Sequence, residues 1–163
     1  MNRSICISAL LLATACGGGG LSEDDVIDLP AGDATGVLHA GDWSLETLTT
    51  SCAGDCEGSI DGFGFSVCDV GDRNDMTADV TQDDGAISFD VPDSEFVSRL
   101  DGGVWQSGAF VVGGQRTQQG GQLTILTRAD GTLDGDALTG TASLRIEGAG
   151  AACDVEVDLD GER

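Results

Sequence analysis

The stretch Cys153-Asp154-Val155-Glu156-Val157-Asp158-Leu159 alternates strictly between apolar and acidic side chains. Because successive side chains of an extended strand point to opposite faces, it would bury one face and expose the other. The stretch Leu138–Ile146 repeats the pattern, with apolar or small residues at even positions and polar residues at odd ones. One buried and one solvated face is typical of antiparallel sheets.

Shorter runs of the same kind lie at residues 76–80, 87–91, 104–112 and 123–127. Asp-Gly pairs, which favour tight turns, occur at 61–62, 84–85, 101–102, 130–131, 134–135 and 160–161. We therefore interpret Asp84, Asp130 and Asp134 as turn residues rather than ligands. The sequence predicts a nearly all-β domain over residues 41–163, with seven to nine strands in meander order.

The N-terminal segment has a different character. Met1-Asn2-Arg3 carries one positive charge, and an uncharged apolar run from Ile5 to Ala13 follows it. This run is too short to cross a bilayer, which needs about 20 residues. A short basic start, an apolar run and small residues before a cleavage point are typical of an export signal, here residues 1–15.

The residues Leu12-Ala13-Thr14-Ala15-Cys16 resemble the lipobox of a bacterial lipoprotein signal peptide, with Ala13 in place of the usual Leu. The resemblance implies cleavage before Cys16, acylation of Cys16 (palmitate among the chains) and attachment to a membrane of the cell envelope. Gly17, which is not acidic, favours the outer membrane within this family. The alternatives are an ordinary signal peptide that leaves Cys16 as a free thiol, and a membrane-spanning helix.

Residues 16–40 are rich in glycine and acidic side chains and contain Pro30, which predicts a flexible acidic tether. A run at residues 26–29 could instead dock on the domain as an edge strand. Without residues 1–15 the chain has 6 arginines, no lysine and 29 acidic residues, a net charge of −23. Such a charge disfavours binding to nucleic acid and to anionic lipid headgroups.

Four cysteines remain once Cys16 is assigned to the lipid, and an exported protein meets oxidising conditions, so two disulfides are predicted. If the first strand runs antiparallel to the last, placing Cys52 opposite Cys153 also places Thr50 opposite Val155 and Leu48 opposite Val157, with all six facing inward. This placement requires a bulge near Glu46 or Thr47. We therefore expect Cys52–Cys153 and Cys56–Cys68. The main alternative is Cys52–Cys56 with Cys68–Cys153.

Pairing of the first and last strands implies a small antiparallel up-and-down β-barrel, with a β-sandwich as the alternative. Gly41-Asp42-Trp43 resembles the Gly-x-Trp at the start of lipocalin and avidin-like barrels. The resemblance implies that Trp43 plugs the closed end of the barrel and that a late arginine, here Arg163, packs on it. A tryptophan that merely begins a sandwich strand is the alternative.

Catalytic signals are scarce. His39 is the one histidine, and no Gly-x-Ser-x-Gly or His-Glu-x-x-His motif is present, so we expect no enzyme, no catalytic residues and no cofactor. Asp69, Asp72 and Asp75 concentrate carboxylates in one loop and are weak candidates for calcium, although their spacing is not that of an EF-hand. A solvated turn is the simpler interpretation, with no metal site.

Two classes of function remain. The first is a non-enzymatic module, anchored to the membrane, that binds either a small ligand or an envelope or secreted protein. The second is a structural, acidic component of the envelope without a specific ligand. Five aromatic residues would distinguish the two classes: Trp43, Trp105, Phe63, Phe65 and Phe110. A cavity lined by them would favour the first class, whereas a core filled by them would favour the second class or a protein-binding role.

Overall fold

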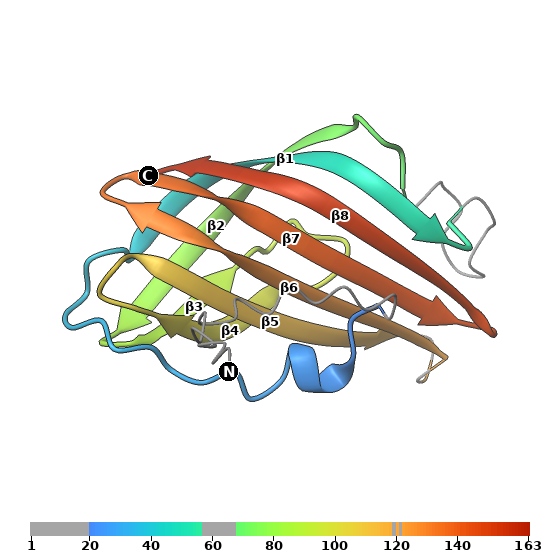
Figure 1. Cartoon of the computed structure of the whole chain (residues 1–163), viewed down its shortest axis with the longest axis horizontal. Coiled ribbons are helices and arrows are strands. Elements are labelled where there is room, and N and C mark those ends of the chain that lie inside the picture. Colours follow the sequence, from blue (N-terminus) through green and yellow to red (C-terminus); the bar gives the residue numbers. More distant parts are fainter. Residues whose placement is uncertain (1–19, 57–67, 119, 121) are drawn as a thin grey trace, which may run out of the picture.

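The structure, a computed structural model, describes residues 20–56, 68–118, 120 and 122–163. Eight antiparallel strands follow one another in sequence order and close into a barrel, as predicted (Figure 1). The strands are β1 (Gly41–Gly54), β2 (Arg73–Asp83), β3 (Ala86–Asp90), β4 (Arg99–Val104), β5 (Ala109–Gln118), β6 (Leu123–Asp134), β7 (Ala137–Gly148) and β8 (Ala151–Glu162). One short 3-10 turn, η1 (Glu23–Asp25), precedes them.

The alternating stretch of β8 behaves as its pattern predicts. Cys153, Val155 and Leu159 are buried inside the barrel, and the acidic residues between them lie on the outer side. β8 pairs with β7 on one side and with β1 on the other, which closes the barrel. Closure leaves β8 with a partner along both of its edges, so neither side of it is exposed as a free edge.

The Asp-Gly pairs are only partly turns. Asp84-Gly85 joins β2 to β3 and Asp134-Gly135 leads from β6 into β7, as predicted. The prediction is wrong at 101–102, 130–131 and 160–161, which lie inside β4, β6 and β8, so Asp130 is a strand residue. A side chain at Gly131 would collide with the carbonyl of Thr139 on β7, so glycine there permits close approach of two strands. The predicted strand over 104–112 is likewise divided by a turn between β4 and β5.

Residues 20–40 lie along the outside of the barrel and are bonded to it, so they do not form the flexible tether that was expected (Figure 1). We call this segment the strap. Its backbone bonds to the barrel from Gly32 N to Gly85 O (2.7 Å) and from Ala34 N to Val104 O (3.1 Å). Val26 is 2 % exposed, although it docks in a turn and not as an edge strand.

Two strand glycines make room for the strap. A side chain at Gly103 would meet the carbonyl of Pro30, and one at Gly113 would meet the backbone of Val26. The strap therefore packs directly on exposed backbone of β4 and β5. Its glycine and acidic composition predicted the absence of regular structure, but the surface that holds it comes from residues far away in the sequence.

The four cysteines form two disulfides, but the predicted pairing is wrong, and so is the main alternative. The bonds are Cys52–Cys68 and Cys56–Cys153. Cys153 faces Gly54 rather than Cys52, because β1 and β8 pair two residues away from the predicted register. The β1 bulge also lies at Thr50 and not near Glu46 or Thr47. The chain then turns after Gly54, and Asp55 N donates to Ala152 O (2.7 Å), which brings Cys56 over Cys153.

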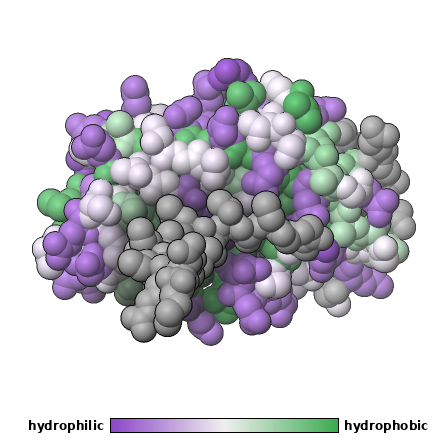
Figure 2. Space-filling model, in the orientation of Figure 1, coloured by the Kyte–Doolittle hydropathy of each residue, from purple (hydrophilic) through white to green (hydrophobic). Residues whose placement is uncertain are grey.

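The predicted signal peptide and Cys16 lie outside the described residues. Among the residues that are described, no helix has the length and apolar character needed to cross a membrane. The face shown in Figure 2 is mostly hydrophilic or neutral, with hydrophobic residues in scattered patches. Exposed large hydrophobic side chains in the described ranges are few: Ile27, Val37, Leu38 and Val70.

Candidate functional site

Trp43 lies near the start of β1, at one end of the barrel. Its side chain is 1 % exposed, and its indole Nε1 donates a hydrogen bond to the carbonyl of His39 (2.9 Å). The guanidinium carbon of Arg163 lies 5.7 Å from the centroid of the Trp43 ring, within range of a cation–π interaction. The predicted contact between Arg163 and Trp43 is thus confirmed.

Arg163 also joins the C-terminus to the strap. It donates to the carbonyls of Leu38 (2.8 Å) and Ala40 (3.4 Å) in the strap and forms an ion pair with Asp136. The backbone N–H of His39 is held by the side chain of Gln82 (2.9 Å). The strap, β1 and the C-terminus therefore form one closed cap over this end of the barrel.

His39 is buried in this cap, and its Nδ1 has no hydrogen-bond partner among the described residues. Burial lowers the pKa of the imidazole below its ordinary value, and the positive charge of Arg163 lowers it further. Protonation of His39 would place a second positive charge beside Arg163 in a site with little access to water. The cap is therefore built for a neutral histidine.

This arrangement predicts a pH dependence of stability. Because the folded pKa of His39 lies below the unfolded one, the unfolded chain binds a proton that the folded chain refuses. The stability that comes from neutral His39 is fully present above about pH 6.5 and is lost as the pH falls below that value. Between about pH 7.5 and about pH 5.5, the wild type should lose more of its free energy of unfolding than His39→Gln does. Urea unfolding at both pH values measures this, and equal losses would contradict it.

Above the cap, the interior of the barrel holds a cavity of about 540 Å³. Its wall is mostly apolar and comes from several strands, including Leu45 on β1, Leu144 on β7 and Val157 on β8. The rings of Phe89 and Phe110, whose centroids are 5.5 Å apart, form another part of the wall. Cavities of about 300–1,000 Å³ with apolar walls are the usual size for binding a small molecule.

The five aromatic residues that would distinguish a cavity from a filled core are divided in the structure. Phe110 lines the cavity, whereas Trp43 and Trp105 do not. Phe63 and Phe65 lie outside the described residues. Phe89 and Phe96 also line it and were missed, since alternation marks Phe89 as buried but cannot tell a packed core from a cavity wall. Small side chains at Ala129 and Ala142 leave the space open.

Polar residues gather where the cavity meets the loops that follow β1 and β3. The carboxylates among the lining residues belong to Asp69, Asp72, Asp75, Asp93 and Glu95. The three calcium candidates are thus brought to the mouth of the cavity. In the part of the chain that the structure describes, however, no group of three or more potential ligands is placed to hold a metal ion. We therefore propose no calcium site.

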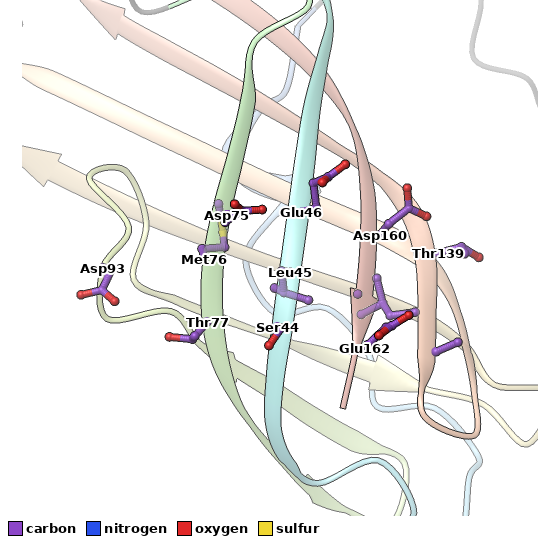
Figure 3. A pocket seen from close by; sticks show the side chains of 13 residues that line it. Ser44, Leu45, Glu46, Asp75, Met76, Thr77, Asp93, Thr139, Asp160 and Glu162 are labelled. Carbon is purple, nitrogen blue, oxygen red and sulfur yellow. The ribbon is translucent and has the colours of Figure 1, made fainter.

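A second hollow, of about 770 Å³, lies where β2, β1, β8 and β7 run side by side (Figure 3). Asp75, Glu46 and Asp160 occupy directly opposed positions on β2, β1 and β8, so three carboxylates form one row across three strands. Like charges placed opposite each other repel, and Arg73, which pairs with Glu46, offsets part of this repulsion. We call this hollow the acidic groove.

Comparison of the chain with protein-family models, with curated proteins and with solved structures finds no match. The features of the chain that bear on its function are the cavity, the acidic groove and the N-terminal sequence.

Proposed function

We propose that this protein is a non-enzymatic binding module of the cell envelope, anchored by a lipid on Cys16, that holds a small apolar ligand inside the barrel. The observation that carries the binding role is the cavity of about 540 Å³ with walls of Leu45, Phe89, Phe110, Leu144 and Val157. A barrel that served only as a structural, acidic component would gain stability by filling this space, since an apolar void weakens a core.

The N-terminal sequence and the docked strap support the anchoring role together. Only residues 17–19 separate Cys16 from the strap at Gly20. Even fully extended, the four residue steps from Cys16 to Gly20 span at most about 14 Å. A lipid on Cys16 would therefore keep the barrel close to the membrane surface, because the strap is bound to the barrel and does not act as a long spacer.

A cavity-filling substitution tests the binding role. Ala142 lines the cavity from β7 and is half-buried, so Ala142→Phe would occupy part of the space that a ligand needs. We expect Ala142→Phe to weaken binding of the neutral fluorescent probe N-phenylnaphthylamine by about tenfold or more. Fluorescence titration of the purified protein, without residues 1–15 and with Cys16 replaced by serine, measures this.

Ala137→Phe is the matched control, because Ala137 lies on the same strand but lines the acidic groove. It should leave the affinity for the probe unchanged, and urea unfolding should show that both variants remain folded. Loss of binding in Ala137→Phe alone would move the site to the acidic groove. Absence of probe binding by the wild type would favour the structural role or a protein partner.

The anchor is tested at Cys16. In a bacterial host, the full chain should fractionate with the membranes, and Cys16→Ser should move nearly all of the protein to the soluble periplasmic fraction. If Gly17 directs sorting as proposed, separation of the two membranes should place the wild type in the outer one. Unchanged membrane association of Cys16→Ser would refute the lipid anchor while leaving the cavity experiment untouched.

A further inference from the structure

The cavity opens to the side of the barrel as well as toward the loops. β3 ends at Asp90, so β2 pairs with β3 only from Asp79 onward. The earlier residues Arg73–Ala78 pair with β1 on one side, and no described strand pairs with their other side. The loop after β3 borders this gap, and Asp93 of that loop lines both the cavity and the acidic groove.

The cavity and the acidic groove meet at this gap. They share four lining residues, of which Leu45 and Met76 are apolar and Asp75 and Asp93 are acidic. Leu45 is buried and Met76 is half-buried, whereas both carboxylates are exposed. A molecule that enters by the gap would therefore place its apolar part against Leu45 and Met76 and leave its outer end beside Asp75 and Asp93.

No positive charge balances these carboxylates within the lining. The described residues that line the cavity include five carboxylates and no arginine or histidine. Residues 57–67, outside the described part, contain no basic residue in their sequence. Arg73 is paired with Glu46, and Arg116 donates to the carbonyls of Glu95 and Phe96, both at 3.1 Å.

The arginines elsewhere in the described part are engaged as well. Arg99, Arg128, Arg145 and Arg163 each form an ion pair with at least one carboxylate. Arg116 keeps its positive charge, because its partners are neutral carbonyls. The five carboxylates of the lining outnumber this one guanidinium, so the field at the mouth of the cavity is negative. An anionic headgroup, such as that of a fatty acid, would be repelled there. A neutral headgroup would gain no charge–charge attraction.

We propose that the cavity takes a cationic amphiphile, with an apolar chain inside the barrel and an ammonium-type headgroup between Asp75 and Asp93. This assignment rests on the proposed binding role and adds the chemical class of the ligand. The apolar wall supplies affinity through the area removed from water. The two carboxylates supply selection for positive charge, which is strongest at low ionic strength.

Displacement of bound N-phenylnaphthylamine by three dodecyl compounds tests the charge selection. Dodecyltrimethylammonium, dodecanol and dodecanoate share one chain length and differ in headgroup charge, and each is used below the concentration at which it forms micelles. At low salt the cation should displace the probe about tenfold more effectively than the alcohol, and dodecanoate should be the weakest. The advantage of the cation should shrink in about 0.5 M NaCl.

Charge-neutral variants identify the carboxylates. Asp75→Asn with Asp93→Asn should weaken the binding of dodecyltrimethylammonium about fivefold and leave the binding of dodecanol unchanged. Asp134→Asn with Asp158→Asn removes the same total charge from exposed positions that line neither hollow. This control should leave the affinities for both compounds as they are in the wild type.

The outcomes separate the two proposals. If the probe binds and Ala142→Phe blocks it, but the three headgroups compete equally, the charge selection is wrong and the binding role stands. If Asp134→Asn with Asp158→Asn weakened the binding of the cation equally, the assignment of Asp75 and Asp93 would also be overturned. If the probe does not bind at all, the binding role fails, and the assignment of a cationic ligand fails with it.

Discussion

Replacing both Cys56 and Cys153 with alanine should lower the free energy of unfolding by about 4–5 kcal/mol in the chain-entropy description of cross-links. The bond joins residues 97 positions apart, so it removes a large amount of freedom from the unfolded chain. Removal of both cysteines avoids an unpaired thiol. Denaturation in urea under oxidising conditions gives the free energy for each protein.

Removal of the other disulfide, with Cys52→Ala and Cys68→Ala, is the matched control. The Cys52–Cys68 bond closes a loop of only 16 positions, so the same description gives a loss of about 3 kcal/mol in the free energy of unfolding. Equal losses for the two pairs would contradict the difference in loop length as the cause. The pairing itself can be read after cleavage before aspartates, which separates all four cysteines: peptide 42–54 should be linked to 61–68, and 55–60 to 136–153.

Trp43→Ala should lower the free energy of unfolding by about 3–5 kcal/mol, because it removes a large, fully buried side chain and leaves a void. The variant also loses the hydrogen bond to His39 and the contact with Arg163. The hydrogen bond holds the strap to the barrel directly, and the ring of Trp43 contacts Arg163, which itself donates to Leu38 and Ala40 of the strap. Urea unfolding measures the loss, and limited proteolysis should show the strap to be cleaved faster than in the wild type.

Trp105 provides the control, since it is the second of the two tryptophans and is only half-buried. Trp105→Ala should cost clearly less stability than Trp43→Ala and should leave the cleavage rate of the strap closer to that of the wild type. If the two variants lost the same stability, Trp43 would not be the plug of the closed end.

Alternation of apolar and acidic residues was sufficient to predict the class of fold. Along β8 the period of two placed Cys153, Val155 and Leu159 inside, since no other regular structure buries every second residue. The closure of the first strand on the last was a hypothesis used to align the cysteines, and the structure confirms it. The contact of Arg163 with Trp43 followed from a three-residue resemblance, and the structure confirms it.

The candidate site was only partly visible in the sequence. The wall residues of β7 and β8 followed from alternation, but that signal is the same for a filled core and for a cavity. The cavity depends on small side chains at Ala129 and Ala142 and on the early end of β3 at Asp90. Its acidic mouth arises because Asp75 on β2 and Asp93 in the loop after β3 meet in space.

By itself, then, the sequence determined the class of fold and, along the clearly alternating stretches, which face of a strand is buried, because these properties depend on neighbours one or two positions away. The tertiary structure alone decided the disulfide pairing, the docking of the strap and the opening of the cavity. The register of β1 against β8 places Cys153 opposite Gly54, and the backbone exposed at Gly103 and Gly113 receives the strap. Such features depend on the register between distant strands, where a shift of one or two residues changes every partner without changing the local pattern.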